Sequence, residues 1–89
     1  MTLKRFAARR DENEGEIIDA LKRIGVQCWQ ISGAGVPDLL TWRQGIWLPI
    51  EVKSPGGELT VAQLKTIESA PFPVVETVEQ ALVLFGVKI

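Results

Sequence analysis

Hydrophobic positions recur along the chain with two different periods, and the change of period separates the predicted elements. From Ile17 to Ile24 apolar residues repeat at the spacing of one helix face, after residues 11–14, which have the form of a capping box. Gly25 follows the last apolar position, and glycine commonly ends helices. The pattern therefore predicts an amphipathic helix between Asp11 and Gly25.

Three short apolar stretches with the alternation of strands follow this helix. In the third stretch Glu51 and Lys53 point to one face, together with Trp47. The apolar residues at 46, 48, 50 and 52 point to the other face, which we expect to be buried. Pro49 removes a ladder donor, which predicts a bulge or an unpaired edge. The predicted strands are residues 26–31, 38–43 and 46–53, with a turn at 44–45.

The second half of the chain predicts a helix, a short strand and a last short helix. Residues 60–63 form another capping box, and Pro71 ends the helix that they open. Residues 73–76 resemble a strand, and residues 77–80 cap a helix that runs toward Gly86. A right-handed crossover sets the last strand parallel to the third, whereas the first three form an antiparallel meander. The fold class is thus α/β, with an αβββαβ core, a mixed four-stranded sheet, flanking helices and a short C-terminal helix.

Composition narrows the classes of function. The 89 residues suffice for one domain, which we place at residues 11–89 behind an arm of residues 1–10. The chain contains no histidine and one cysteine, Cys28, which excludes disulfides, thiolate-imidazole zinc sites and histidine catalysis. No apolar run is long enough to span a bilayer, and the start does not resemble a signal peptide. We therefore expect a cytoplasmic protein with neither a membrane partner nor a nucleotide cofactor.

Charge is balanced overall but not locally. The formal net charge is −1, yet the first ten residues include four basic and no acidic side chains. Such a start is either a solvated arm or an arm that contacts phosphates, and both interpretations stay open. The basic residues that we assign to phosphate contact are Lys4, Arg5, Arg9, Arg10, Arg43 and Lys65.

Two short segments place charged side chains together at the edge of the predicted sheet. Asp38 opens the second strand after a Gly-Val-Pro loop, while Glu51 and Lys53 end the third strand. Two carboxylates and an ammonium on a half-buried surface are costly to desolvate unless they have a counter-ion or a role. A divalent metal and a phosphate would supply both. The alternatives are a turn aspartate that caps the loop and an exposed ion pair along the strand.

The acidic residues of the first helix have two interpretations. Glu14 closes the first capping box, where a carboxylate is needed for structural reasons alone. It also lies one turn before Ile17 and Ile18, on the stripe that faces the sheet. Glu16 falls off that stripe and is the second choice for a functional acid.

Together these residues resemble the PD-(D/E)XK nuclease superfamily, and within it the small stand-alone VRR-NUC domains of phages and bacteria. The resemblance extends from about residue 10 to Gly86 and follows the same order of elements. The matching segments are Asn13-Glu14-Gly15-Glu16-Ile17, Gly35-Val36-Pro37-Asp38-Leu39-Leu40, Glu51-Val52-Lys53, and Leu59-Thr60 followed by Gln63.

The resemblance implies metal-dependent hydrolysis of phosphodiester bonds. Asp38, Glu51 and the Val52 backbone carbonyl would hold the metal. Glu14 would complete the acidic site, while a glutamine at position 63 would line it as well as closing its capping box. Carboxylates without imidazole or paired thiolates favour Mg²⁺ or Mn²⁺. Lys53 would orient or deprotonate the attacking water, or offset charge on phosphorus.

The resemblance also implies an endonuclease that is selective for branched DNA, similar to Holliday-junction resolvases, and that pairs two sites in a homodimer. The small core independently favours a dimer. Two other functions stay open, namely a non-catalytic binding module on this scaffold and a metal-dependent phosphatase of small substrates. The interface candidates are the apolar C-terminal segment and the three tryptophans, at least two of which we expect in the core: Trp29, Trp42 and Trp47.

Overall fold

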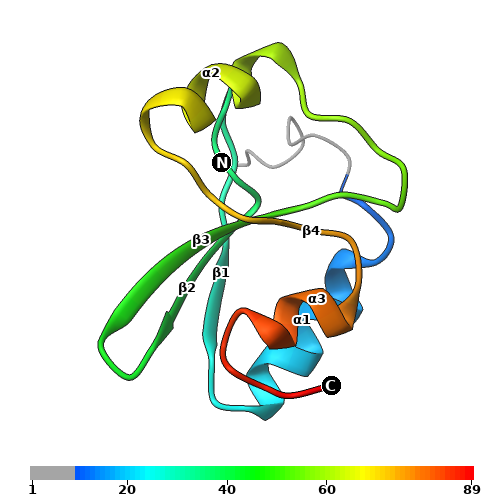
Figure 1. Cartoon of the computed structure of the whole chain (residues 1–89), viewed down its shortest axis with the longest axis vertical. Helices are drawn as coiled ribbons and strands as arrows, with labels where there is room; N and C mark the ends of the chain where they lie inside the picture. Colours follow the sequence, from blue (N-terminus) through cyan, green and yellow to red (C-terminus); the bar gives the residue numbers. More distant parts are fainter. Residues whose placement is uncertain (1–9) are drawn as a thin grey trace, which may run out of the picture.

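Residues 10–89 are described by a computed structural model, in which two helices lie against one side of a sheet and a third lies near its end (Figure 1). Residues 1–9 lie outside this description, and the predicted phosphate contacts of Lys4, Arg5 and Arg9 lie there. The elements are α1 (Glu14–Arg23), β1 (Gln27–Gln30), β2 (Leu39–Arg43), β3 (Ile46–Val52), α2 (Val61–Ser69), β4 (Val74–Val75) and α3 (Val78–Val83).

The sheet has four strands in the order β1-β2-β3-β4. β1, β2 and β3 form an antiparallel meander, whereas β4 runs parallel to β3 after the crossover through α2. This arrangement confirms the predicted α/β class, the mixed sheet and the order of the elements. No helix within residues 10–89 is long and apolar enough to cross a membrane.

The hairpin between β2 and β3 fixes the register of the site. Gln44 and Gly45 have φ angles of 53° and 86°, as a two-residue hairpin turn requires. Counting from this turn, Pro49 lies opposite Leu40 in a pair that exchanges no hydrogen bonds. An N–H at position 49 would therefore point away from β2, toward the edge of β3 on which β4 lies. There β4 pairs only with Glu51 and Val52, so Pro49 faces no partner strand. The expected unpaired edge is confirmed, and there is no bulge.

One face of the sheet is packed against α1 and α3 (Figure 1). Ile17 and Leu21 project from α1 and are fully buried. The prediction of a buried face along β3 is correct at its end, where Ile50 is 0% exposed, and wrong at its start, where Ile46 is 68% exposed. At the hairpin tip, Ile46 borders a hollow that it shares with Leu84 and Phe85, and most of its side chain stays exposed.

The other face of the meander carries the three tryptophans. Trp29 and Trp47 are 45% and 57% exposed, and their ring centroids lie 5.6 Å apart. Trp42 is half-buried, with its centroid 6.5 Å from that of Trp47. The expectation that at least two of them pack in the core is therefore wrong. Cross-strand pairing places their side chains on the face opposite to α1 and α3.

The two predicted capping boxes have different outcomes. The box that opens α2 is present, since Thr60 and Gln63 exchange both hydrogen bonds. The box predicted at Asp11 is wrong, because α1 begins at Glu14 with Asn13 as its N-cap and without a side-chain cap bond. Glu14 is thus the first residue of the helix and has no capping role.

Candidate active site

The ladder of hydrogen bonds between β2 and β3 ends at the Pro-Asp segment. Beyond this point, backbone N–H and C=O groups of β3 are available to side chains. Continuing the register by two residues beyond Leu39 places Pro37 opposite Val52. Proline has no N–H to offer to the Val52 carbonyl. The Val52 N–H instead donates to Asp38 Oδ2 at 3.0 Å. Asp38 is thereby fixed beside the end of β3, with the Val52 carbonyl lacking a ladder donor from β2.

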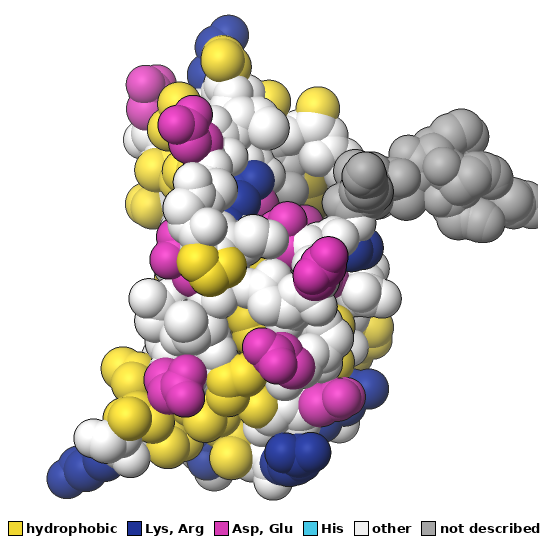
Figure 2. All heavy atoms as spheres, turned by 90° about the vertical axis from the view of Figure 1, so that its right-hand side faces the viewer, with side chains coloured by type: hydrophobic (Ala, Val, Ile, Leu, Met, Phe, Trp, Pro, Cys, Tyr) yellow, Lys and Arg dark blue, Asp and Glu magenta, His cyan; other side chains and the backbone are white. Residues whose placement is uncertain are grey.

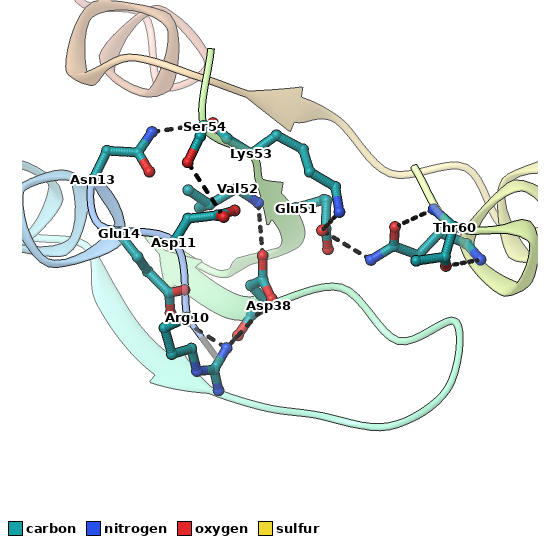
Figure 3. Close-up of polar contacts among 11 residues, drawn as sticks. Arg10, Asp11, Asn13, Glu14, Asp38, Glu51, Val52, Lys53, Ser54 and Thr60 are labelled. Carbon is teal, nitrogen blue, oxygen red and sulfur yellow. Dashed lines mark hydrogen bonds and ion pairs between the residues drawn. The ribbon is translucent and has the colours of Figure 1, made fainter. Parts of the chain in front are cut away.

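Glu51 and Lys53 extend from the end of β3 on the face predicted for them (Figure 3). Glu51 is 1% exposed, and its Oε2 lies 3.2 Å from Lys53 Nζ. The same oxygen accepts a hydrogen bond of 2.8 Å from Gln63 Nε2. Because this ion pair is buried, the alternative of an exposed pair along an edge strand does not describe it.

Gln63 joins the capping of α2 to the site. Its Oε1 accepts the Thr60 N–H at 2.9 Å, while its Nε2 donates to Glu51. The two interpretations of this glutamine therefore hold together, since one amide group fulfils both at once. The capping box fixes the side-chain orientation that presents Nε2 to the carboxylate.

Gly35 makes room for this helix. It has a φ of +76°, and a Cβ built on it would lie 2.6 Å from Thr66 Oγ1 and 2.8 Å from the Ala62 carbonyl oxygen. Both contacts are shorter than real Cβ atoms allow. The glycine of the Gly-Val-Pro-Asp loop therefore lets the loop approach α2 closely and holds Gln63 near Glu51.

Glu14 points from the start of α1 toward the same region (Figure 3). It is 2% exposed, and its Oε2 accepts a hydrogen bond of 3.0 Å from Gln30 Nε2. Glu16, the second choice, is exposed to solvent. Of the two glutamates, the structure brings only Glu14 to the acidic cluster, and it removes the capping role that gave Glu14 a structural explanation.

Asn13, Gln30 and Arg10 contact the site without having been assigned to it from the sequence. Asn13 Nδ2 donates to the carbonyls of Lys53 and Glu76, at 3.1 and 2.7 Å, and ties α1 to the ends of β3 and β4. The available signal for Asn13 was its place in the segment of residues 13–17 that carries the resemblance. Arg10 was expected to contact phosphate, but its guanidinium lies between Glu14 and Asp38 (Figure 3).

Burial leaves the carboxylates short of donors. Glu14 Oε1 and Glu51 Oε1 are buried without a hydrogen-bond partner among residues 10–89. Burial raises the pKa of the Glu14 carboxyl, against the Gln30 hydrogen bond and the Arg10 charge. Burial, and then the charge of Asp38, raises the pKa of Glu51, against its contacts with Lys53 and Gln63. Buried oxygens without donors are what a cation would satisfy.

A divalent ion fits the chemistry of these donors. Within residues 10–89 no three aspartate, glutamate, histidine or cysteine side chains lie close enough together to hold a metal. The negative charge of Asp38 nevertheless acts on both glutamates, and each glutamate has one buried oxygen without a donor. All these ligands are oxygen atoms, which suit Mg²⁺ or Mn²⁺. Asp38, Glu51, Glu14 and the Val52 carbonyl therefore have the donor chemistry of such a site, but the three carboxylates are not spaced to hold one ion together.

A narrow cleft leads to the acids. Its volume is about 210 Å³, and Asp38 is the one of the three acids that lines it, together with Arg10, Thr60, Gln63, residues 32–34 and Val36. It is too small for a nucleotide but has room for a hydrated ion. A larger apolar hollow of about 630 Å³ lies elsewhere, between β4, α3 and Ile89. Figure 2 faces this side and shows hydrophobic side chains gathered at its lower left. The larger hollow contains none of the acidic cluster.

The remaining basic residues lie apart from the acids. Arg43, at the other end of β2 from Asp38, donates to the Phe85 carbonyl at 2.9 Å. Lys65 is exposed on α2, two residues after Gln63. Comparisons with models of protein families, with curated proteins and with solved structures found no match for this chain.

Proposed function

We propose that this protein is a metal-dependent DNA endonuclease of the PD-(D/E)XK type, similar to stand-alone VRR-NUC domains. The observation that carries the proposal is a set of three neighbouring carboxylates from three parts of the chain, two of them buried. Glu14 comes from α1, Asp38 from the loop before β2, and Glu51 with its ion-paired lysine from β3. Two of these carboxylates keep a buried oxygen without a donor. Such an arrangement costs stability, which favours a function for it.

The residues of the cluster have separable roles in this proposal. Asp38, Glu51 and the Val52 carbonyl would hold Mg²⁺ or Mn²⁺, and Glu14 would bind a second ion or a water at the first. The bound ion lowers the pKa of a water and stabilises charge on the scissile phosphate.

The remaining two side chains would position the reacting groups. Gln63 keeps Glu51 in place through Nε2. Lys53 Nζ, 3.2 Å from Glu51, orients or deprotonates the attacking water, or offsets charge on phosphorus.

The proposed substrate is branched DNA, cut by a homodimer with two paired sites. The cleft accepts an ion but no base, so contacts would reach the backbone and depend on DNA shape. Lys65, exposed on α2, would contact phosphate, and Lys4, Arg5 and Arg9 would extend the contact. Such an enzyme would work in the cytoplasm, that of the host if a phage encodes it.

A non-catalytic nucleic-acid-binding module is the second candidate. The observation that favours it is that each carboxylate is already close to a cation of the same chain, Arg10 or Lys53. A scaffold without chemistry would need such internal neutralisation. It would bind branched DNA without cutting it, whatever metal is present.

One experiment separates the candidates. Cleavage of a four-way junction, a linear duplex and a small phosphomonoester is measured with Mg²⁺, with Mn²⁺ and with EDTA. We expect metal-dependent junction cleavage that falls about 10²-fold or more in Asp38→Asn and in Glu51→Gln. Glu68→Gln, an exposed position on α2, is the matched control. Unchanged cleavage in either folded site variant would refute the assignment, and binding without cleavage by the wild type would favour the non-catalytic module.

A further inference from the structure

Arg10 is the only described arginine whose guanidinium lies among the site acids, within residues 10–89. Its Nη1 lies 3.3 Å from Asp38 Oδ1 and 3.4 Å from Glu14 Oε2. Nη1 also approaches the Asp38 carbonyl oxygen at 3.5 Å, and Nη2 donates to the Ile31 carbonyl at 3.1 Å. One planar group thus bridges α1, the end of β1 and the loop before β2 (Figure 3).

The two cations of the site divide the acids between them. Lys53 pairs with Glu51 alone, whereas Arg10 bridges Glu14 and Asp38. Without Arg10, these two carboxylates, which repel one another, would have no ion-pair partner among residues 10–89. The side chain of Arg10 is 29% exposed and lines this cleft, so it can leave its position without disturbing the core.

A divalent ion between the same carboxylates would meet the guanidinium at close range. Two positive groups cannot share these oxygens without strong repulsion. Arginine stays protonated at every pH at which the protein is folded, so it cannot make way by losing its proton. It must move if the ion binds Glu14 and Asp38 together.

We propose that Arg10 is an internal substitute cation that holds Glu14 and Asp38 together in the metal-free protein and is displaced when a divalent ion binds. This inference rests on the proposed function, because it assumes that these acids bind metal. It assigns to Arg10 a positioning role that the sequence did not suggest. The affinity for metal is then set partly by the ion pairs that must be broken first.

The test measures Mn²⁺ binding to the full chain by calorimetry, without DNA, in the wild type and in Arg10→Gln. In the wild type, metal binding must break two partly exposed ion pairs, which costs a modest free energy. Arg10→Gln avoids this cost, so we expect it to bind Mn²⁺ about tenfold more tightly. Arg10→Lys, which keeps the charge and loses the planar fork, should lie between the two. Arg23→Gln on the exposed end of α1 removes one positive charge away from the site and should change affinity little.

Two further measurements distinguish displacement from general electrostatics. Magnesium should raise the thermal midpoint more in Arg10→Gln than in the wild type, because the variant has lost its counter-ion in the metal-free state. The ¹⁵N signal of the Arg10 guanidinium should move toward that of a solvated arginine when Mg²⁺ is added.

The outcomes are decisive in each direction. Equal or weaker Mn²⁺ binding by Arg10→Gln, with wild-type binding that depends on Asp38 and Glu51, overturns the inference and leaves the proposed function intact. An unmoved guanidinium signal at saturating Mg²⁺ does the same. No Mn²⁺ binding by either protein overturns both. If Arg10→Gln does not fold, the intermediate affinity of Arg10→Lys decides, and wild-type affinity there counts against displacement.

Discussion

The two ends of β3 belong to one strand but have opposite environments. At the hairpin end Ile46 and Trp47 are 68% and 57% exposed, whereas at the other end Ile50 and Glu51 are 0% and 1% exposed. An apolar side chain thus lies in solvent while a carboxylate is buried. At the buried end, Ile50 packs in the core between the sheet, α1 and α3, while Gln63 of α2 contacts Glu51 on the other face.

This difference shows what position along a strand contributes to chemistry. Alternation decides which face a side chain takes, and both ends of β3 obey it. Burial depends on the elements that cover each end. Burial raises the pKa of Glu51 and leaves one of its oxygens without a donor, so the covered end is the one to which we assign the proposed chemistry. The hairpin end borders a hollow of about 250 Å³, whose lining includes Arg43 and no acidic residue.

The largest effect expected at the buried end is that of Lys53→Ala on turnover. Lys53 shares its strand face with Glu51, so its loss should remove a proton-transfer or charge-offsetting group and lower cleavage of junction DNA by about 10²-fold or more. Metal affinity and DNA affinity should stay close to wild type. Cleavage kinetics and calorimetry check this, with exposed Lys65→Ala as the control. Intact turnover with weaker DNA binding would reduce Lys53 to an ordinary phosphate contact.

The next largest effect is structural and concerns the glycine that seats α2 on the buried end. Gly35→Ala combines a left-handed φ with contacts below 3.0 Å to Thr66 and Ala62. We expect a loss of about 2–4 kcal/mol in the free energy of unfolding. Gly56→Ala has a similar φ of +84° but open space around its Cβ, so it should lose only about 1 kcal/mol. Urea denaturation measures both, and equal losses would mean that the packing of α2 is unimportant.

The sequence predicted the strands and helices that meet at the two ends of β3, and the face of the sheet to which each side chain points. Period and turn chemistry are local properties, so the meander, the turn at 44–45 and the parallel last strand all follow from them. It also predicted the proximity of Asp38, Glu51 and Lys53. The proximity of these three residues depends only on the register between β2 and β3, which the hairpin turn determines.

The errors concern properties that depend on distant elements. The sequence cannot tell how far α1 and α3 extend over the inner face, so the exposure of Ile46 was missed. Nor can it tell that Trp29 and Trp47 lie on the other face of the meander with large parts of their rings exposed. The capping-box pattern that begins at Asp11 was misleading, because the helix starts at Glu14. The side chain of Asn13 binds backbone carbonyls at the ends of β3 and β4, forty or more residues away. Arg10 was assigned to phosphate because its neighbours are basic, while its actual partners come from two other parts of the fold.

A smaller effect is expected on the pH dependence of stability at the buried end. The pKa of Glu51 is raised above its ordinary value of 4.5, so the folded state holds its proton more tightly than the unfolded state. Its contribution is therefore most favourable below about pH 4.5 and is lost as pH rises through the folded pKa. Glu51→Gln removes this loss, because an amide does not titrate.

Denaturation of the metal-free protein between pH 4.5 and 8 tests this, with exposed Glu58→Gln as the control. Glu51→Gln should lose less stability over this range than wild type. Saturating Mg²⁺ at pH 8 should then stabilise the wild type but not the variant. A variant that loses as much stability as wild type would show that Lys53 and Gln63 fully compensate the buried charge.

The smallest effect on folding is expected at the hairpin end, and it sharpens the comparison most. Trp47 is 57% exposed and packs chiefly on two other tryptophans, so Trp47→Ser should cost the folded monomer about 1 kcal/mol or less. The same substitution should dissociate the proposed homodimer if the tryptophan face is its interface, since exposed aromatic side chains dominate such contacts. Sedimentation at low micromolar concentration measures this, with Val83→Ser at the apolar hollow as the control. A wild-type monomer, or a dimer that survives Trp47→Ser and dissociates in Val83→Ser, would refute an interface at this end of the strand while leaving the acidic site at the other end untouched.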